Sequence, residues 1–471
     1  MDTIWRPDLL DAPGPKYKTV MQAIRDAITT DALRPGDKLP PVRDLAWKLG
    51  ITPGTVARAY TLLTDDGALV AEVGRGTFVA RPDSKTPLLA DVPLEVDSAT
   101  HNAEAQSWHV NLFSPHLPSV GQAPLIRKLM AQIAQDPPSG LMHYPTRSGG
   151  QPARAAAVQW LGTAPLGSFG PDDVVLANGG QNAILMIFQT LLQGRRPAVL
   201  VEELAYPGFR RAAELLRADV IPVAMDADGL IPEALEAAAR THDAQILCIS
   251  PEVHNPTLGF TPQNRRAALV DVARRCDLQI LEDDCYRLGE AQAPTFRMLA
   301  PERSWYISSI SKSITPALRL GIAVAPPGQA AALRRTSEYS FFGLATPLTD
   351  LCAALLVHPD LPPVMEAARL GIGTYVQRAV NILGSFDLTW RADVPFLWLR
   401  LPEGWRAGAF VQAAEGQGVR IRAAEEYACR DARAPHAVRF AINAGLSLDS
   451  FEAGLMRLRD LLNNPPDVIG V

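Results

Sequence analysis

The order of apolar and polar residues predicts three short helices and a hairpin in the first part of the chain. Apolar residues recur at helical spacing through Val20–Ile28 and again through Val42–Leu49. A third helix is expected to begin at Thr52, because a hydroxyl residue followed by proline favours a helix start. Two β-prone runs, 69–73 and 77–79, then flank a glycine turn and predict a β-hairpin.

Further along, short apolar runs alternate with helical stretches such as Gln181–Leu192 and Thr261–Cys276. This alternation predicts an α/β fold whose mostly parallel sheet is covered by helices on both faces. Ligands of such sheets bind at the carboxyl ends of the strands, so the residues that follow each strand are the candidates for function. The seven predicted strands are Val174–Ala177, Ala198–Glu203, Val220–Met225, Gln245–Ser250, Leu278–Asp284, Trp305–Ser311 and Gly321–Ala325.

The chain is predicted to contain more than one domain, because 471 residues are too many for a single compact core. Two late apolar runs, Phe396–Pro402 and Val438–Ile442, predict strands of a small C-terminal α+β unit. Residues 81–108 lack periodicity and are rich in Pro, Asp, Ala and Glu, which is typical of a linker. The prediction is therefore a head at residues 1–80, this linker, and a body at residues 109–471.

The composition is that of an ordinary globular protein, with 47% hydrophobic and 20% charged residues. The five cysteines are scattered and form no Cys-x-x-Cys pair, which argues against a disulfide framework or a structural metal site. No run approaches the ~20 apolar residues of a membrane span, and charges stand where a signal peptide would need an apolar core. We therefore expect a cytoplasmic protein with no metal site and no membrane segment.

The head has the charge and the helix pattern of a DNA-binding unit. Residues 15–60 contain eight Lys or Arg and four Asp, a local net charge of +4 (8 − 4) within a chain of net charge −5. Two short helices joined by a tight turn can place the second helix in a DNA major groove, while basic residues hold phosphates. The alternative is a plain three-helix packing unit, which the pattern alone leaves open.

Three motifs run through the head: Leu33-x-Pro35-Gly36-x-x-Leu39-Pro40-x-x-Arg43-x-Leu45-Ala46, Leu49-Gly50-Ile51-Thr52-x-x-Thr55-Val56-x-x-Ala59-Tyr60-x-x-Leu63, and Gly74-x-Gly76-Thr77-Phe78-Val79. Together they resemble the GntR-type winged helix-turn-helix over residues 17–80. The chain departs from many members at Pro41, where serine is common, and at Pro53, where arginine is common. The residues that the resemblance places against DNA are Arg43, Thr52, Thr55, Arg58, Gly74 and Arg75.

Lys312 is one of only two lysines after position 110, in a segment that otherwise meets its need for positive charge with arginine. It comes directly after a predicted strand. Lysine can form a Schiff base with an aldehyde, whereas arginine cannot. The alternative is a partly buried lysine whose amine merely reaches out to solvent.

Other polar residues also follow the predicted strands. The glycine turn at Asn178–Gly180 leads into a helix, whose first amides favour a phosphate. Tyr206 is suited to stack on a flat ring, and Asn255 presents an amide donor before a proline. A carboxylate of Glu282–Asp284 would keep a pyridine nitrogen protonated. Each pattern has a plainer alternative, namely a simple turn or a helix cap.

Charged and hydroxyl groups also lie near Lys312 and towards the C-terminus. Ser309, Ser311 and Arg319 flank Lys312 with groups that suit a phosphate. Arg439 lies within an apolar run, where an unpaired guanidinium is costly. A ligand carboxylate would pair with it through two hydrogen bonds, and a structural salt bridge is the alternative.

The order of these motifs along the chain is more specific than any one of them. A glycine turn, Tyr-Pro-Gly, Asn-Pro-Thr, Asp-x-x-Tyr, Ser-x-x-Lys with a following Arg, and a late arginine strand resemble the fold type I, class I aminotransferase family over residues 110–465. The resemblance implies pyridoxal phosphate as cofactor, bound to Lys312 as an internal aldimine, with Arg439 taking a ligand carboxylate. It favours Asp283 over Asp284 as the partner of the pyridine nitrogen. The other implied contacts are Asn255 and Tyr286 to the ring hydroxyl, Tyr206 stacked on the ring, and Gly180, Gln181, Ser309 and Arg319 around the phosphate.

One more tyrosine matches the aminotransferase family, and the chain departs from the family pattern at two places. Tyr144 resembles the family's tyrosine that reaches the cofactor of a neighbouring subunit. The usual Asn-Pro-Thr-Gly is lengthened by Leu258, and the usual glycine pair before Phe396 is replaced by Val394-Pro395. These departures imply a remodelled substrate side.

Head and body together resemble the MocR/GabR family of transcriptional regulators. The resemblance implies a protein that senses a small amino compound by external aldimine formation and binds double-stranded operator DNA. It further implies a domain-swapped or head-to-tail homodimer in the bacterial cytoplasm, associated with the nucleoid. The main alternative is a catalytically active class I aminotransferase with an accessory DNA-binding head, since the same lysine and aspartate serve both. A weaker alternative is a regulator whose body no longer binds a cofactor.

Overall fold

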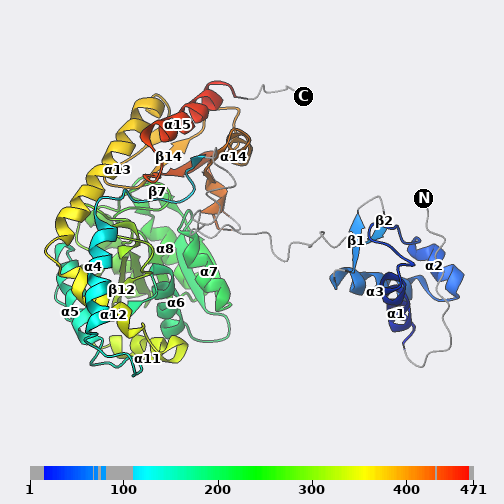
Figure 1. The fold of residues 1–471 in the computed structure, drawn as a ribbon, viewed down its shortest axis with the longest axis horizontal. Helices are drawn as coiled ribbons and strands as arrows, with labels where there is room; N and C mark the ends of the chain where they lie inside the picture. Colours follow the sequence, from blue (N-terminus) through cyan, green and yellow to red (C-terminus); the bar gives the residue numbers. More distant parts are fainter. Residues whose placement is uncertain (1–14, 67, 73–75, 81–109, 430–431, 466–471) are drawn as a thin grey trace. The chain divides into compact units, whose positions relative to one another are not determined.

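The computed structural model describes residues 15–66, 68–72, 76–80, 110–429 and 432–465 (Figure 1). By its internal contacts the chain divides into two compact units, Met1–Leu94 and Glu95–Val471. The predicted linker, 81–108, and the predicted wing residues Gly74 and Arg75 lie outside the described residues.

The smaller unit is a winged helix-turn-helix, which confirms the predicted helices and hairpin. Its elements are α1 (Lys16–Thr29), α2 (Val42–Leu49), α3 (Pro53–Asp65) and the antiparallel strands β1 (Leu69–Glu72) and β2 (Gly76–Val79). Apolar side chains from all three helices, among them Ile24, Leu45 and Val56, form one buried core. Helix α2 ends at Gly50, whose φ of 63° is a left-handed conformation that glycine adopts at little cost.

The larger unit is built on the predicted sheet of seven strands, in the order β4-β12-β11-β10-β9-β5-β6. Every neighbouring pair is parallel except the two pairs that β12 makes, with β11 and with β4. The strands are β4 (Val174–Ala177), β5 (Ala198–Glu202), β6 (Asp219–Val223), β9 (Ile246–Ile249), β10 (Gln279–Asp283), β11 (Ser304–Ser309) and β12 (Gly321–Val324). The prediction carried β11 through Ser311, but the chain turns after Ser309 into the short 3-10 helix η2 (Ile310–Lys312).

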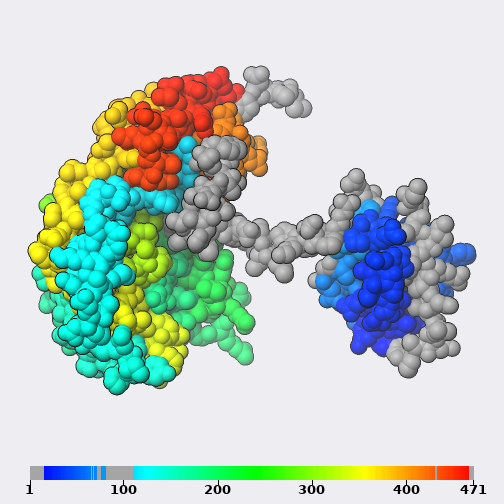
Figure 2. Space-filling model, in the orientation of Figure 1, coloured from blue at the N-terminus to red at the C-terminus, as the bar shows by residue number. Residues whose placement is uncertain are grey.

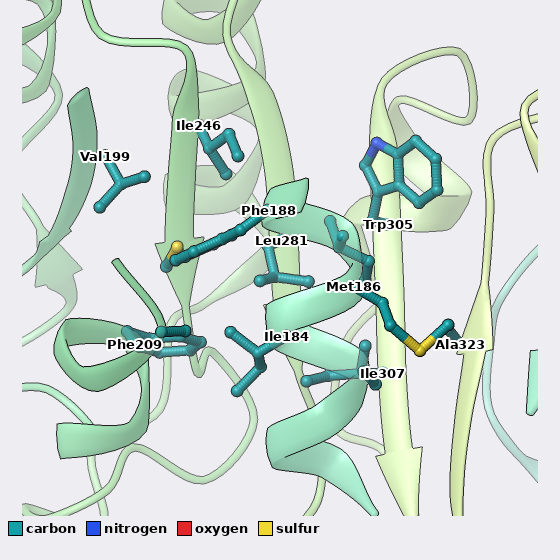
Figure 3. Close-up of a cluster of buried hydrophobic side chains, with 14 of the residues drawn as sticks. Ile184, Met186, Phe188, Val199, Phe209, Ile246, Leu281, Trp305, Ile307 and Ala323 are labelled. Atoms are coloured by element: carbon teal, nitrogen blue, oxygen red, sulfur yellow. The ribbon is translucent and has the colours of Figure 1, made fainter. Parts of the chain in front are cut away.

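Helices cover both faces of this sheet, as the alternation of apolar runs predicts. On one face lie α6 (Gly180–Leu191), α7 (Pro207–Leu215) and α11 (Ala330–Phe341). Figure 3 shows Phe188 of α6 next to Leu281 of the sheet, and Phe209 of α7 next to Ile184 of α6. On the other face lie α4 (Gln122–Gln135), α5 (Gln151–Trp160), α8 (Pro232–His242), α9 (Gln263–Arg275), α10 (Phe296–Leu299) and α12 (Thr346–Leu356).

A second, antiparallel sheet confirms the predicted small C-terminal unit. Its order is β13-β14-β17-β16, and the helices α13, α14 and α15 share an apolar core with it. In the space-filling view α13 and α15 lie side by side (Figure 2). The elements are α13 (Leu361–Leu383), β13 (Leu388–Thr389), β14 (Phe396–Arg400), α14 (Ala407–Gly416), β16 (Arg422–Ala423), η3 (Ala424–Glu426), β17 (Ala437–Ala441) and α15 (Leu448–Asn463).

Alternate residues of the small sheet face its two sides, and this alternation decides on which side an arginine lies. Leu397, Val438 and Phe440 lie in the core beneath the helices. Trp398 and Arg439, which are Cα partners, therefore lie on the opposite face. Trp398 there joins a second apolar cluster.

Four short strands complete the larger unit. They are β3 (Val110–Asn111), paired in parallel with β15 (Val419–Arg420), and β7 (Met225–Asp226), paired with β8 (Gly229–Leu230). A 3-10 turn, η1 (Leu161–Thr163), follows α5. Within the described ranges, none of the helices combines the length and the apolar character that a bilayer crossing requires.

Candidate functional site

A tight arrangement of backbone and guanidinium forms one end of the site, where β4 turns into α6. Gly179 has a φ of 84°, and a Cβ atom on it would lie 2.7 Å from Nη2 of Arg319. A Cβ atom on Gly321 would lie 2.5 Å from the backbone carbonyl of Gly179. Arg319 itself has a φ of 48°, a strained conformation for a residue with a side chain. The first amides of α6 and this guanidinium therefore form a cradle for an anion.

Ser309 and Cys285 lie against the start of α6. A Cβ atom on Gly180 would lie 2.9 Å from Sγ of Cys285 and 3.9 Å from Cβ of Ser309. The hydroxyl oxygen of Ser309 accepts from the Ser311 amide at 3.2 Å and lies 2.9 Å from the carbonyl oxygen of Leu320. The cradle thus joins residues from three separate strand ends. Sequence analysis did not select Cys285, because only packing brings its sulfur beneath Gly180.

The Tyr-Pro-Gly segment packs against the same helix. Nε2 of Gln181 donates to the carbonyl oxygen of Gly208 at 2.9 Å. A Cβ atom on Gly208 would lie 2.1 Å from the Tyr206 ring, so only glycine fits there. Tyr206 is the N-cap of α7 and Pro207 its first residue. The segment is thus more than a simple turn, because it fixes the tyrosine ring beside α6.

The two aspartates after β10 have different environments. Asp284 is buried, and its Oδ2 accepts from Nε of Arg287 and from the hydroxyl of Tyr306, both at 2.6 Å. Asp283 ends β10, and its Oδ1 accepts from the Cys285 amide at 3.0 Å. Asp284 is thus engaged through Oδ2 in a buried ion pair, whereas its Oδ1 is buried without a hydrogen-bond partner among the described residues. The expected role of Asp283 as the carboxylate that faces a ligand stays a prediction.

Glu202 and His254 lie buried near Asp283. The pKa of Glu202 is raised to about 8, mainly by burial and in smaller part by the charge of Asp283. Burial lowers the pKa of His254 to about 4. Nε2 of His254 donates to the carbonyl oxygen of Leu204 at 2.7 Å, and Nδ1 lies 2.6 Å from the hydroxyl of Thr257. His254 is thus a neutral residue that holds this loop.

Asn255 provides the most direct test of whether the site suits a cofactor. It is buried, and neither Oδ1 nor Nδ2 of its side chain has a hydrogen-bond partner among the residues that the structure describes. Oε1 of Gln181 is likewise buried without a hydrogen-bond partner among the described residues. Buried polar atoms are nearly always satisfied, so these atoms indicate a polar ligand. Together with the anion cradle and Asp283, they fit a phosphorylated pyridine ring.

Lys312, Tyr286 and Arg439 come together from three distant segments. Nζ of Lys312 lies 5.3 Å from the centre of the Tyr286 ring. The hydroxyl of Tyr286 accepts from Nη2 of Arg439 at 3.1 Å, and the hydroxyl of Tyr427 accepts from Nη1 at 2.7 Å. Arg439 is only 1% exposed and lies 4.2 Å from the centre of the Phe396 ring. The guanidinium of Arg439 is thus buried and held by two tyrosine hydroxyls, and the ligand carboxylate expected at it stays a prediction.

His116 is a second residue that sequence analysis missed. Its amide donates to the carbonyl oxygen of Ile442 at 2.9 Å, which ties its segment to the end of β17. Burial and the nearby charge of Lys312 both lower the pKa of His116. Its place beside Lys312 results from tertiary packing, and no local pattern in the sequence could have indicated it.

Both departures from the aminotransferase pattern fall in one apolar cluster next to Arg439. Leu258 adopts a φ of 61°, and its amide donates to the carbonyl oxygen of His254 at 2.8 Å, which absorbs the additional residue. Leu258 and Val394 are buried together with Tyr286 and Phe396. The substrate side is thus more closely filled by apolar side chains than glycines would leave it.

Tyr144 is placed on the surface of the larger unit. Its side chain is 79% exposed, and its ring lies 5.7 Å from that of Phe342. Its predicted reach into a neighbouring subunit therefore stays a prediction.

In the head, the described residues of the predicted DNA face lie at or near the surface. Arg43, Thr52 and Arg58 are exposed, and Thr55 is partly exposed. The hydroxyls of Thr52 and Thr55 lie 2.9 Å apart, so Thr52 does not cap α3 with its side chain. The Arg58 guanidinium lies over the ring of Tyr17 at 4.3 Å.

Comparison with known proteins agrees with both units. Residues 116–458 match the family described as aminotransferase class I and II, and residues 16–79 match the gntR family of bacterial regulatory proteins. The HTH-type transcriptional regulator YdeF of Bacillus subtilis is 28% identical over 464 residues, which cover 98% of this chain and 97% of that protein. The HTH-type transcriptional regulator TauR of Rhodobacter capsulatus is 30% identical over 357 residues, which cover 68% of this chain and 70% of TauR.

Among solved structures, the kynurenine aminotransferase of Pyrococcus horikoshii has the same fold as the body. The TM-score is 0.68 at 20% identity, over 77% of this chain and 92% of that chain. This family and fold imply pyridoxal phosphate as the cofactor.

Proposed function

Because the chain belongs to the aminotransferase class I and II family and carries a gntR-family head, we propose that it is a transcriptional regulator that senses a small amino compound. The body holds pyridoxal phosphate and receives the effector, and the head binds operator DNA. The observation that carries the proposal is the convergence of Lys312, Tyr286 and Arg439, which places an amine beside a buried acid-binding group.

The roles proposed for the cofactor residues are those that the resemblance to the aminotransferase family implies. The amine of Lys312 carries the cofactor, and Asp283 faces its ring nitrogen. Asn255 and Tyr286 face the ring hydroxyl, and Tyr206 stacks on the ring. The phosphate is held by Gly180, Gln181, Ser309 and Arg319. When bound, the cofactor would supply an electrophilic carbon, and a primary amine that attacks it would release the amine of Lys312.

Arg439 is proposed to orient the effector through its acid group. Its guanidinium is fixed between two tyrosine hydroxyls and lies against the Phe396 ring. A carboxylate placed there would hold the amine of the effector towards Lys312. Burial strengthens this electrostatic contact, because water screens it less than at the surface.

Signal transfer is proposed to depend on the small C-terminal unit, which carries Arg439. A ligand that contacts both this unit and the cofactor stabilises whichever arrangement brings the two together. In a domain-swapped or head-to-tail homodimer, that change would alter the spacing of two heads and hence the operator that fits. Such a regulator acts in the bacterial cytoplasm, at the nucleoid.

The second candidate function is a working class I aminotransferase with an accessory DNA-binding head. The observation that favours it is that the residues assigned to the cofactor are all present, including Lys312 and Asp283. Repeated turnover of amino-group transfer, measured with amino-acid and oxo-acid pairs, would identify an enzyme.

The test of the proposal uses the purified full-length chain supplied with pyridoxal phosphate. We expect a visible absorbance band, a borohydride-stable adduct on Lys312 by mass spectrometry, and a spectral change on adding an acid-bearing amine. The Lys312→Ala variant should show neither the band nor the adduct. A wild-type protein that stays colourless and forms no adduct would contradict the proposal.

A further inference from the structure

The segment that carries Tyr427 is paired with the residues directly after strand β5. The Ala205 amide donates to the carbonyl oxygen of Tyr427 at 2.9 Å. Beside this bond, Leu204 and Ala428 form an antiparallel bridge. The small C-terminal unit is thus joined, through the backbone at Tyr427, to the segment that leads into α7.

One arginine of α7 bonds to the carbonyl groups on both sides of Tyr427. Nη1 of Arg210 donates to the carbonyl oxygen of Ala428 at 2.6 Å, and Nη2 donates to that of Glu426 at 3.3 Å. Its contact with the exposed carboxylate of Glu214 is longer, at 4.0 Å. A guanidinium is a rigid planar fork, so two bonds to one short segment fix the position and the direction of that backbone.

Tyr427 in turn holds the group to which the effector acid is assigned. Its hydroxyl accepts from Nη1 of Arg439 at 2.7 Å, and the tyrosine is only 2% exposed. In a closely packed interior, such a side chain moves with its backbone and its partners. A shift of the backbone at 426–428 would therefore displace the Arg439 guanidinium relative to Lys312.

We propose that Arg210 is a positioning residue for the effector site, because it fixes Tyr427 and through it the guanidinium of Arg439. This inference rests on the proposed function and adds a residue by which α7 controls the affinity for an acid. Tyr206, which is assigned to the cofactor ring, is the N-cap of the same helix. One element thus carries both the residue that stacks on the cofactor and the residue that positions the acid-binding group.

A purely structural Arg210 makes a different prediction. Its loss would lower stability without changing which ligands bind. Arg303 provides the matched control, because its Nη1 also donates to two backbone carbonyls, those of Ala273 and Leu278, both at 3.2 Å. These contacts lie where β10 and β11 begin, at the opposite end of these strands from the proposed cofactor site.

The first experiment measures ligand discrimination in the cofactor-loaded full-length protein. Short amino acids, and the amines that lack their carboxyl groups, are titrated by absorbance, and the wild type should prefer the acid-bearing member of a pair. In Arg210→Gln this preference should fall by about 2- to 30-fold, the usual range for residues that act on a site without touching its ligand. The affinity for the matched amine and the cofactor band should stay unchanged. In Arg303→Gln the preference should persist.

A double-mutant cycle tests whether Arg210 acts through Tyr427. Tyr427→Phe removes the hydroxyl that holds Arg439, so it should lower the same preference. Because both substitutions break one chain of contacts, the loss in the double variant should be smaller than the product of the two separate losses. If Arg210→Gln fails to fold, Arg210→Lys takes its place in the cycle, since a lysine amine is a point charge and not a fork.

Three outcomes would each overturn the role of Arg210. They are an acid preference within about twofold of the wild type in the Arg210 variant, an equal loss of preference in Arg303→Gln, and fully independent losses in the cycle.

Hydrogen exchange separates this inference from the proposed function. The Ala205 amide, which donates to Tyr427, should exchange faster in Arg210→Gln than in the wild type or in Arg303→Gln. If no amine alters the wild-type spectrum, the sensor is refuted, and the exchange rate still decides on Arg210: faster exchange supports the positioning, and an unchanged rate overturns it. If amines alter the spectrum but Arg210→Gln keeps the wild-type preference and exchange rate, only the positioning role fails.

Discussion

The head and the body hold their functional side chains in opposite ways. In the head, Arg43 and Arg58 are exposed on helices and Thr52 is exposed just before α3, whereas other residues form the core. In the body, Arg439 and Asn255 are buried, and the hydrogen bonds of Arg439 join it to tyrosines from other segments. Substitutions in the head should therefore change binding alone, whereas substitutions in the body change binding and folding together.

The largest effect should come from Arg439. Arg439→Gln removes the proposed partner of the effector carboxylate, so affinity for an acid-bearing amine should fall by about 2–5 kcal/mol, the cost of truncating a buried charged contact. Spectral titration of the cofactor-loaded protein with the amine measures this affinity. DNA affinity without effector should stay at the wild-type value. An unchanged effector affinity would remove the role assigned to Arg439.

Two glycine-to-alanine substitutions, one in the body and one in the head, compare how tightly each region is packed through the change in unfolding free energy. In Gly321→Ala the new Cβ would lie 2.5 Å from the Gly179 backbone, which cannot yield as a flexible side chain can. We expect a loss of about 1–3 kcal/mol or more in unfolding free energy, together with weaker cofactor binding. Gly54→Ala in α3 is the matched control, because its Cβ would meet nothing within 4 Å. That variant should be neutral or up to ~1 kcal/mol more stable. Equal losses in both variants would contradict the contrast.

Arginine substitutions in the head should affect only DNA. If the Arg43 side chain contacts a base, Arg43→Ala should weaken operator binding by about 1–3 kcal/mol. If it contacts a phosphate instead, the slope of log affinity against log salt concentration should fall by about the amount that one phosphate contact contributes. Arg58→Ala should cost less, because part of its guanidinium already lies against Tyr17. Gel-shift titrations at several salt concentrations measure both variants. Wild-type DNA affinity in both would count against the assigned face, and a lost cofactor band in either would contradict the separation of head from body.

The smallest expected effect is a pH dependence confined to the body. The pKa of Glu202 is raised from 4.5 to about 8, and that of Glu282 likewise to about 8, mainly by burial. Between pH 4.5 and about 8, both carboxyl groups are protonated in the folded state and ionised in the unfolded state. The free energy of unfolding therefore falls as pH rises. The pKa of His254, lowered from 6.5 to about 4, gives the opposite slope below pH 6.5. The clean window is therefore pH 6.5 to 8.

Glu202→Gln should roughly halve the fall in stability across that window, because the Glu282 carboxyl remains. Denaturant unfolding at several pH values measures the slope. A slope identical to the wild type would show that the carboxyl of Glu202 titrates normally in the folded protein.

The sequence predicted the elements better than the contacts. Helices and strands follow from local periodicity, and the order of the motifs along the chain is enough to propose Lys312, Asp283 and Arg439 as site residues. The packing of α7 against the Tyr427 segment is not local, and it alone makes Arg210 a partner of that segment. His116 and Cys285 likewise acquire meaning only through packing. Residues that act through neighbours distant in sequence were therefore the ones missed.

The most direct test of the account measures DNA affinity with and without effector in the same protein. The full-length wild type and Lys312→Ala are titrated against an operator selected from random duplexes, first alone and then with a saturating acid-bearing amine. The account predicts that the amine changes wild-type affinity by about 5- to 150-fold, the usual size of an allosteric coupling, and leaves Lys312→Ala at the unliganded value. An equal change in both proteins, or no change in the wild type with any amine that alters its spectrum, would contradict the claim that this lysine links the effector to the head.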